Sequence, residues 1–283
     1  MKNYFLALFI VVHSVAIGQS ITGRIMDNIT GEGLAYANIN VTGKNIGCIS
    51  NKNGDFTIDV SQTQKTDTLK FSYISYETFA IVFSKIDLSG KLIIKLQPKS
   101  TVLTEVIISN KPESHRLGNQ KVDRKYTGWG DFKSLKGRIR GLLIEGAECP
   151  VKIKSLSFRI NHNEWDSVAF RINFLKVENG RPAESILKRN IFIITSQKYK
   201  WVNIDLSDHE IILCNKVIAT LEWVDAWGPI GKYSNLMTLS LGKDSGYTFN
   251  QEPGHEFGTL SFDKNSPAIF IELYGKNKTP LPK

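Results

Sequence analysis

Apolar and polar residues alternate with a period of two along most of the chain, in short runs separated by glycine, proline or asparagine. This pattern is typical of half-buried β-strands, because successive side chains of a strand point to opposite faces. Runs with the spacing of a helix face are nearly absent. We therefore predict an all-β chain of short strands joined by tight turns.

The first part of the chain predicts a β-sandwich over residues 19–109. Its alternating runs are separated by glycines, and the last run ends before Pro98, which cannot continue a paired strand. Asn53-Gly54 is a strong turn signal because both residues tolerate a positive φ. A partial calcium loop is the alternative for this turn, but the distal glutamate of such loops is missing. The separating glycines are Gly23, Gly31, Gly33, Gly43, Gly47 and Gly54.

The same region resembles the carboxypeptidase regulatory-like domain, a small transthyretin-like sandwich. The segment from Asp67 to Phe79 is also similar to this family, although Ser75 stands where glycine is usual. Residues 103–109 resemble the segment that joins such domains to the plug of TonB-dependent outer-membrane receptors. The remaining chain is too short for the barrel of those receptors, so the resemblance implies the N-terminal module alone. The residues that carry the main resemblance are Ile21, Gly23, Ile25, Asp27, Gly31, Leu34, Ala37, residues 39–43, Asn53, Gly54 and Phe56.

Residues 1–18 have the pattern of a cleaved secretory signal. Lys2 precedes an apolar run from Tyr4 to Val15, and small residues follow at positions 16–18. An uncleaved anchor is the alternative, but the run is shorter than the roughly 20 residues that a spanning helix needs. We expect an exported protein that begins at Gln19 and works in the periplasm, the outer membrane or at the cell surface.

Three cysteines, Cys48, Cys149 and Cys214, lie far apart in or beside apolar runs. An odd number in an exported chain leaves at least one thiol without an intramolecular partner. Three buried, unreactive thiols are the favoured interpretation. A bridge between Cys149 and Cys214 is the alternative.

The formal net charge of +9 is concentrated in one short segment. Residues 110–140 hold nine Lys and Arg but only three Asp and Glu, whereas the chain on either side is nearly balanced. We predict a basic linker over residues 110–136. Together with Tyr126, Trp129 and Phe132, it could contact an anionic envelope surface, whereas nucleic acid is not an expected partner of an exported chain. The alternative is a solvated linker whose aromatic residues dock on the second domain.

A second β-sandwich is predicted over residues 137–283. About nine or ten alternating runs follow one another there, with a turn at Asn179-Gly180. Two stacked antiparallel sheets are the expected product, and the run from Phe170 to Leu206 loosely resembles jelly-roll modules of secreted and surface proteins. The sequence thus predicts a second, jelly-roll-like domain.

The sequence predicts no catalytic residue, metal site or cofactor. It contains no His-Glu-x-x-His, Gly-x-Ser-x-Gly or Gly-Lys-Ser/Thr motif. The densest group of titratable residues runs from His162 to Asp166, in a segment expected to be a turn. A polar turn is the favoured interpretation, and an acid/base pair is the alternative.

The predicted ligand-binding residues are Asp225, Trp227, Tyr233 and Asn235. They lie in a segment rich in glycine and proline that follows an apolar strand. A flat indole can stack on the apolar side of a sugar ring, while carboxylate and amide groups bind its hydroxyls. The alternative is that Trp227 closes the end of the sandwich.

These patterns favour a non-catalytic envelope protein that binds or assembles with an outer-membrane protein or a glycan. A secreted hydrolase of glycans or peptides is the first alternative, with the turn from His162 to Asp166 as its candidate site. A purely structural envelope component is the second. Neither sandwich architecture decides between them, because both host many activities.

Overall fold

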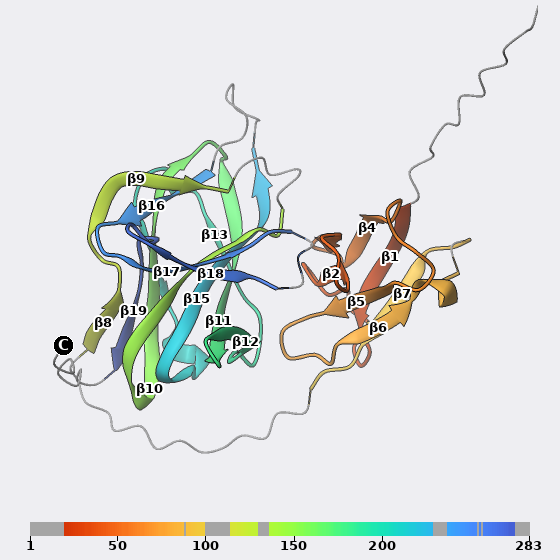
Figure 1. The fold of residues 1–283 in the computed structure, drawn as a ribbon, viewed down its shortest axis with the longest axis horizontal. Coiled ribbons are helices and arrows are strands. Elements are labelled where there is room, and N and C mark those ends of the chain that lie inside the picture. The colour runs from red at the N-terminus through yellow and green to blue at the C-terminus, as the bar shows by residue number, and fades with distance from the viewer. Residues whose placement is uncertain are drawn as a thin grey trace, which may run out of the picture.

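The computed structural model describes residues 20–87, 89–99, 114–129, 136–228, 237–253, 255 and 257–274. The predicted signal segment, residues 1–18, lies outside these residues. Every regular element in the described part is a β-strand or a three-residue 3-10 helix, which confirms the all-β prediction. Figure 1 shows two bodies of strands, a smaller one from the N-terminal part and a larger one from the rest. None of the described helices is long and apolar enough to cross a membrane.

The N-terminal domain is a sandwich of two sheets. One sheet has the order β4-β1-β7, with β1 and β7 parallel, and the other has the order β3-β2-β5-β6. Alternate side chains of both sheets, among them Ile25, Ile39 and Phe71, are fully buried between them. The strands are β1 (Ser20–Asp27), β2 (Asn38–Val41), β3 (Gly47–Ile49), β4 (Asp55–Asp59), β5 (Thr68–Ser72), β6 (Phe79–Val82) and β7 (Leu92–Leu96).

Two turns of this domain depend on positive φ angles. Gly54 has a φ of +84°, as predicted, and a Cβ there would lie 2.4 Å from the Ile25 carbonyl oxygen. The turn joins β3 to β4, which belong to different sheets, so it is not the turn of a paired hairpin. Ser75 has a φ of 67° where the related family has glycine, and its hydroxyl donates to the Leu187 carbonyl of the second domain. This hydroxyl contact offsets part of the cost of a left-handed serine.

The second domain is also a sandwich, as predicted. In one sheet β11 pairs with β12, β13 and β15, and the order continues through β10, β17 and β18. In the other sheet β10 pairs with β14, β19 and β16. Strand β19 also pairs with β8, and β16 also pairs with β9. The strands are β8 (Ser114–Gly118), β9 (Val122–Gly128), β10 (Ile139–Asn163), β11 (Ser167–Glu178), β12 (Arg181–Ser185), β13 (Ile191–Thr195), β14 (Trp201–Asp205), β15 (Ile212–Trp227), β16 (Met237–Gly242), β17 (Gly246–Gln251), β18 (Thr259–Asp263) and β19 (Ile269–Tyr274).

The long strand β10 belongs to both sheets. Its residues 139–152 pair with β15, and its residues 153–163 pair with β19, β14 and β16. Strands that pass from one sheet to another do so at bulges or bends. The register of β10 against β15 shifts on both sides of Ala147, and Gly146 has a φ of +89°.

A disulfide between Cys149 and Cys214 bridges β10 and β15 beside this bend. The favoured interpretation of three thiols was therefore wrong, and the alternative bridge is the one that forms. The two residues are 65 positions apart, but antiparallel pairing of β10 with β15 places their Cα atoms 4.2 Å apart. Cys48 is a free thiol. The positions of Cys149 and Cys214 in the sequence could not show that β10 and β15 pair in a register that brings the two residues together.

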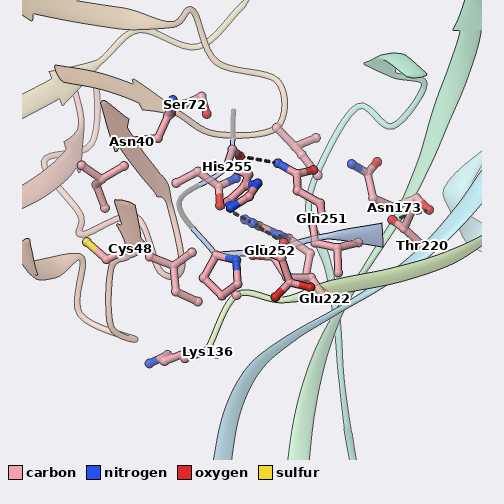
Figure 2. Close-up of a pocket in the computed structure, with 18 of the residues that line it drawn as sticks. Asn40, Cys48, Ser72, Lys136, Asn173, Thr220, Glu222, Gln251, Glu252 and His255 are labelled. Atoms are coloured by element: carbon pink, nitrogen blue, oxygen red, sulfur yellow. Dashed lines mark hydrogen bonds and ion pairs between the residues drawn. The ribbon is translucent and has the colours of Figure 1, made fainter. Parts of the chain in front are cut away.

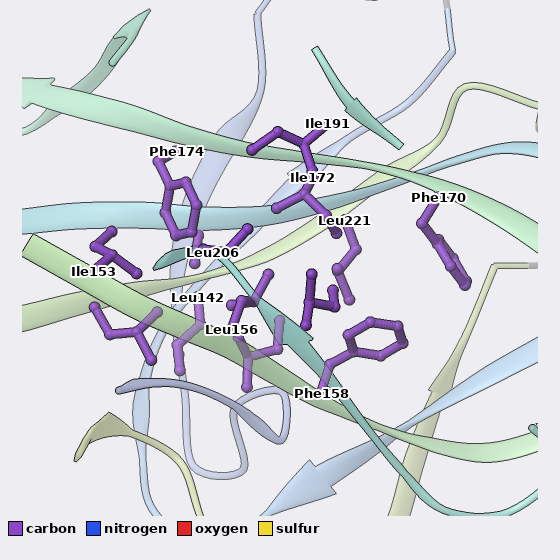
Figure 3. Packing of buried hydrophobic residues seen from close by; sticks show 14 of the residues in the cluster. Leu142, Ile153, Leu156, Phe158, Phe170, Ile172, Phe174, Ile191, Leu206 and Leu221 are labelled. Atoms are coloured by element: carbon purple, nitrogen blue, oxygen red, sulfur yellow. The ribbon is translucent and has the colours of Figure 1, made fainter. Parts of the chain in front are cut away.

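The core of the second domain lies between its two sheets. Figure 3 shows inward-facing residues of β10 and β11, such as Phe158, Phe170 and Phe174, packed together. Trp129 joins this core with no exposed surface, and its ring centroid is 5.3 Å from that of Phe170. The indole Nε1 donates to the Arg138 carbonyl at 3.2 Å, so the polar edge of this buried ring is also satisfied.

The predicted basic linker over residues 110–136 is wrong for residues 114–129. Residues 114–118 pair with β19 as β8, and residues 122–128 pair with β16 as β9. Trp129 docks in the core, as the alternative had it, whereas Phe132 lies outside the described residues. Tyr126 is exposed. Both strands lie at sheet edges and expose basic side chains. Because edge strands are often charged, their composition resembles that of a linker.

One buried carboxylate ties the strand β8 to its neighbours. Glu272 on β19 accepts from Arg116 of β8 at 3.3 Å and from Lys154 of β10 at 2.7 Å. These contacts, led by Lys154, lower the pKa of Glu272 to about 2.

Replacing Glu272 by glutamine should therefore lower the free energy of unfolding by about 1–2 kcal/mol at neutral pH. Because the folded pKa is depressed, this stabilisation is present above the unfolded value of about 4.3 and is lost as the pH falls toward 2. Urea unfolding of wild type and Glu272→Gln at several pH values measures the difference. The exposed Glu178→Gln serves as the control, and a difference that does not shrink in acid would contradict the assignment.

Candidate functional site at the domain junction

The two domains meet through the outer faces of two sheets. On the N-terminal side, β2 and β5 bury alternate residues in their own core and turn Asn38, Asn40, Lys70 and Ser72 the other way. On the other side, β11 and β15 turn out two cross-strand pairs, Arg171 with Glu222 and Asn173 with Thr220. A cavity of about 180 Å³ lies between these faces and is lined by all eight of these residues.

Residues of the second domain close the remaining sides of this cavity. Lys136 and Gly137 lead into β10, Gln251 ends β17, and Glu252 and His255 follow that strand. Figure 2 shows Asn40 and Ser72 on strands of one domain, Glu222 and Thr220 on strands of the other, and Gln251 and His255 between them. Gln251 donates from its Nε2 to the His255 carbonyl at 2.8 Å, and Glu252 pairs with Arg138 and Arg140.

A buried ion pair stands at the centre of the junction. Arg171 is 2% exposed and Glu222 is 4% exposed. The guanidinium donates to Oε2 of Glu222 from Nε at 2.7 Å and from Nη2 at 2.5 Å. It also reaches the N-terminal domain, where Nη1 donates to the Tyr36 carbonyl at 2.7 Å and Nη2 to Oδ1 of Asn38 at 3.3 Å. Arg171 thus balances a buried carboxylate and joins the two domains.

Two polar atoms that line the cavity have no hydrogen-bond partner among the described residues. They are Oε1 of Glu222, an acceptor, and Nδ2 of Asn40, a donor on a residue that is 8% exposed. A buried polar group without a partner costs about 1–3 kcal/mol. Such a cost is expected where a ligand or ordered water completes the site.

Burial governs the titration of two groups on this lining. It raises the pKa of Glu222 above its ordinary value, and Arg171 acts in the opposite direction. Burial also raises the pKa of the Cys48 thiol to about 12, against a smaller effect of Lys136. The Cys48 thiol is therefore protonated at neutral pH and is a poor nucleophile.

A small apolar contact and one phenol close the junction on another side. Tyr36 packs with Ala169 and Val224 of the second domain. Its hydroxyl donates to Oδ2 of Asp225 at 2.8 Å. Burial and this carboxylate hold the pKa of Tyr36 well above its ordinary value, so the phenol stays a donor.

The structure describes two of the four predicted ligand residues, Asp225 and Trp227. Asp225 accepts from Tyr36 and from the Ala226 backbone, which gives its carboxylate a role in domain docking. Trp227 ends β15 and is 38% exposed. Tyr233 and Asn235 lie outside the described residues.

The segment from His162 to Asp166, predicted as a turn with an alternative acid/base role, is also described. The turn prediction was wrong for His162, which lies in β10 and pairs with Thr238 of β16. Nε2 of His162 lies 3.4 Å from Oε1 of Glu164, and the His162 side chain is half exposed. Among the described residues, no group of three or more His, Cys, Asp or Glu could hold a metal ion.

Sequence reasoning missed Arg171, Glu222 and Asn40. A signal for the first two exists, because each is a single charge inside an apolar strand, in Phe170-Arg171-Ile172 and in Leu221-Glu222-Trp223. Charges in such places are rarely buried unless they are paired. The sequence could therefore have predicted that Arg171 and Glu222 form an ion pair between neighbouring strands.

Residues 21–108 match the family model described as CarboxypepD_reg-like domain. The N-terminal sandwich is a CarboxypepD_reg-like domain. This supports the resemblance drawn from the glycine pattern, and Asn38 and Asn40 of the cavity belong to this CarboxypepD_reg-like domain. No curated protein matches the chain.

Two solved structures are similar to the chain at 10% sequence identity. One is the clostridial cysteine protease Cwp84 after propeptide cleavage, with a TM-score of 0.41 over 74% of this chain and 51% of that chain. The other is the cysteine protease and lectin-like domains of Cwp84, a surface layer associated protein of Clostridium difficile, with a TM-score of 0.38 over 92% of this chain and 59% of that chain. The chain thus spans between half and three fifths of these structures.

Proposed function

We propose that this protein is a non-catalytic binding protein of the cell envelope, with a glycan or an outer-membrane protein as its partner. The junction supports a recognition role, because Arg171 and Tyr36 fix the CarboxypepD_reg-like domain against the second sandwich. An anionic envelope surface could also be contacted through the basic segment 110–136.

Two features of the chain support this location. The signal segment predicted over residues 1–18 would direct the chain out of the cytoplasm, and a disulfide such as Cys149–Cys214 persists in oxidising compartments. The periplasm, the outer membrane and the cell surface all fit these two features.

The exposed indole of Trp227 is the observation that supports a glycan as the partner. It lies at the end of β15, two residues beyond the Asp225 carboxylate that docks Tyr36. A partly exposed aromatic face at the rim of a rigid sandwich suits the apolar side of a sugar ring. Tyr233 and Asn235 follow closely in the chain and complete the proposed ligand set.

Replacing Trp227 by alanine should abolish retardation of the protein in native gels that contain neutral polysaccharides. Loss of one stacked aromatic typically costs about 1–3 kcal/mol, which is about five- to 150-fold in affinity. Phe262→Ala removes a more exposed aromatic residue on β18, at 61% against 38% for Trp227, and should leave retardation unchanged.

Salt separates the remaining partners in the same gels. Retardation by acidic polysaccharides that disappears at high salt, in wild type and Trp227→Ala alike, would move the site to the basic segment. If no polysaccharide retards the wild type, the glycan is excluded and an envelope protein remains as the partner, which crosslinking in intact cells would then identify.

A further inference from the structure

We propose that the cavity between the two domains binds a small, neutral, polyhydroxylated molecule of about the size of one sugar ring. One hydroxyl would donate to Oε1 of Glu222, and another would accept from Nδ2 of Asn40. These are the two buried lining atoms that lack a partner in the described structure. A hydroxyl is the group that serves both, since it can donate and accept.

The charges around the cavity favour a neutral ligand. Arg171 already neutralises Glu222, so the pair requires no further cation. A cation would also meet Lys70 and Lys136 on the lining. An anion that only accepts hydrogen bonds would leave Oε1 of Glu222, itself an acceptor, without a donor. A neutral ligand with hydroxyl groups avoids both conflicts.

The size and the surface of the cavity suit a ring with one polar and one apolar side. Its volume of about 180 Å³ leaves room for a single small ring. The polar lining includes the amides and hydroxyls of Asn38, Ser72, Asn173, Thr220 and Gln251. The apolar lining includes Ile39, Ile49, Ile74, Ile139 and Leu175. This site goes beyond the proposed function, because it uses neither Trp227 nor any other residue of the exposed rim.

Calorimetric titration of the purified full chain tests the proposal. The compounds are glucose, galactose and mannose as neutral sugars, glucuronate and glucosamine as charged ones, and cyclohexanol as a ring with one hydroxyl. At least one neutral sugar should bind, and cyclohexanol should not. Asn40→Leu should weaken the binding of that sugar by about three- to tenfold, because it removes one hydrogen-bond donor.

The matched control is Asn203→Leu, which changes an asparagine on β14 that does not line the cavity. It should bind like wild type. Sugar binding at the proposed glycan surface would instead be lost in Trp227→Ala and kept in Asn40→Leu, which separates the two sites. Glu222→Gln replaces the acceptor and should lose binding if its melting curve shows a folded protein. Binding of only a charged sugar, binding that Asn40→Leu does not weaken, or no binding by any compound would each overturn the proposal.

Discussion

Replacing Arg171 by methionine is expected to lower the free energy of unfolding by about 3–5 kcal/mol at neutral pH. The reason is that Glu222 would stay buried at 4% exposure without its counter-charge. The variant also loses the hydrogen bond to the Tyr36 carbonyl, so the CarboxypepD_reg-like domain should dock less firmly. Urea unfolding measures the first effect, and limited proteolysis between the domains measures the second.

The pH dependence of this loss identifies its cause. Burial raises the pKa of Glu222 in the folded protein. The protonated carboxyl therefore stabilises the fold fully below the unfolded pKa of about 4.3. This stabilisation is lost as the pH rises through the folded pKa. Removing Arg171 raises the folded pKa further. The deficit of Arg171→Met should therefore be small near pH 4 and grow toward neutral pH.

Two comparisons make this prediction specific. The double variant Arg171→Met with Glu222→Leu should recover most of the lost stability, because two apolar side chains replace the pair. Arg181→Met, at an exposed position on β12, should change stability by less than about 0.5 kcal/mol. An Arg171→Met protein as stable as Arg181→Met would show that the buried pair does not hold the junction.

The alternation of apolar and polar residues predicted most strands, but it did not distinguish an edge strand from a linker between the domains. Runs such as Leu69 to Phe71 have one buried and one polar face, so their pattern survives in the sequence. Most side chains of β9 are partly or fully exposed, because this strand lies at a sheet edge. Its basic residues therefore interrupt the alternating pattern by which a strand is predicted. The physical signal for a strand weakens when neither face is buried.

The site was less predictable because it combines the outer faces of two domains. Asn38 and Asn40 read as the polar side of β2, and nothing in their own segment shows that Arg171 will meet them. Asp225 was predicted as a ligand residue from its place near Trp227, and the sequence did not show that Tyr36, 189 positions earlier, donates to its carboxylate. Contacts of this kind depend on how domains dock, which local patterns do not encode.

Replacing Cys149 by alanine is expected to lower the free energy of unfolding by about 4 kcal/mol. The Cys149–Cys214 bridge closes a loop of 65 positions, and the entropy of such a loop in the unfolded chain gives this magnitude. The bridge also lies where the ladder between β10 and β15 is irregular, so fewer backbone hydrogen bonds hold the two strands there. Urea unfolding with and without a reductant measures the effect.

The response to the reductant separates the bridge from simple side-chain loss. Wild type should lose stability when it is reduced, whereas Cys149→Ala should be equally stable in both conditions. Cys48→Ala should respond as wild type does, because Cys48 is a free thiol. Since β10 carries strands of both sheets on either side of this bend, loosening it should affect the whole second domain in one transition. Equal stability of wild type with and without reductant would show that the bridge contributes nothing to the fold.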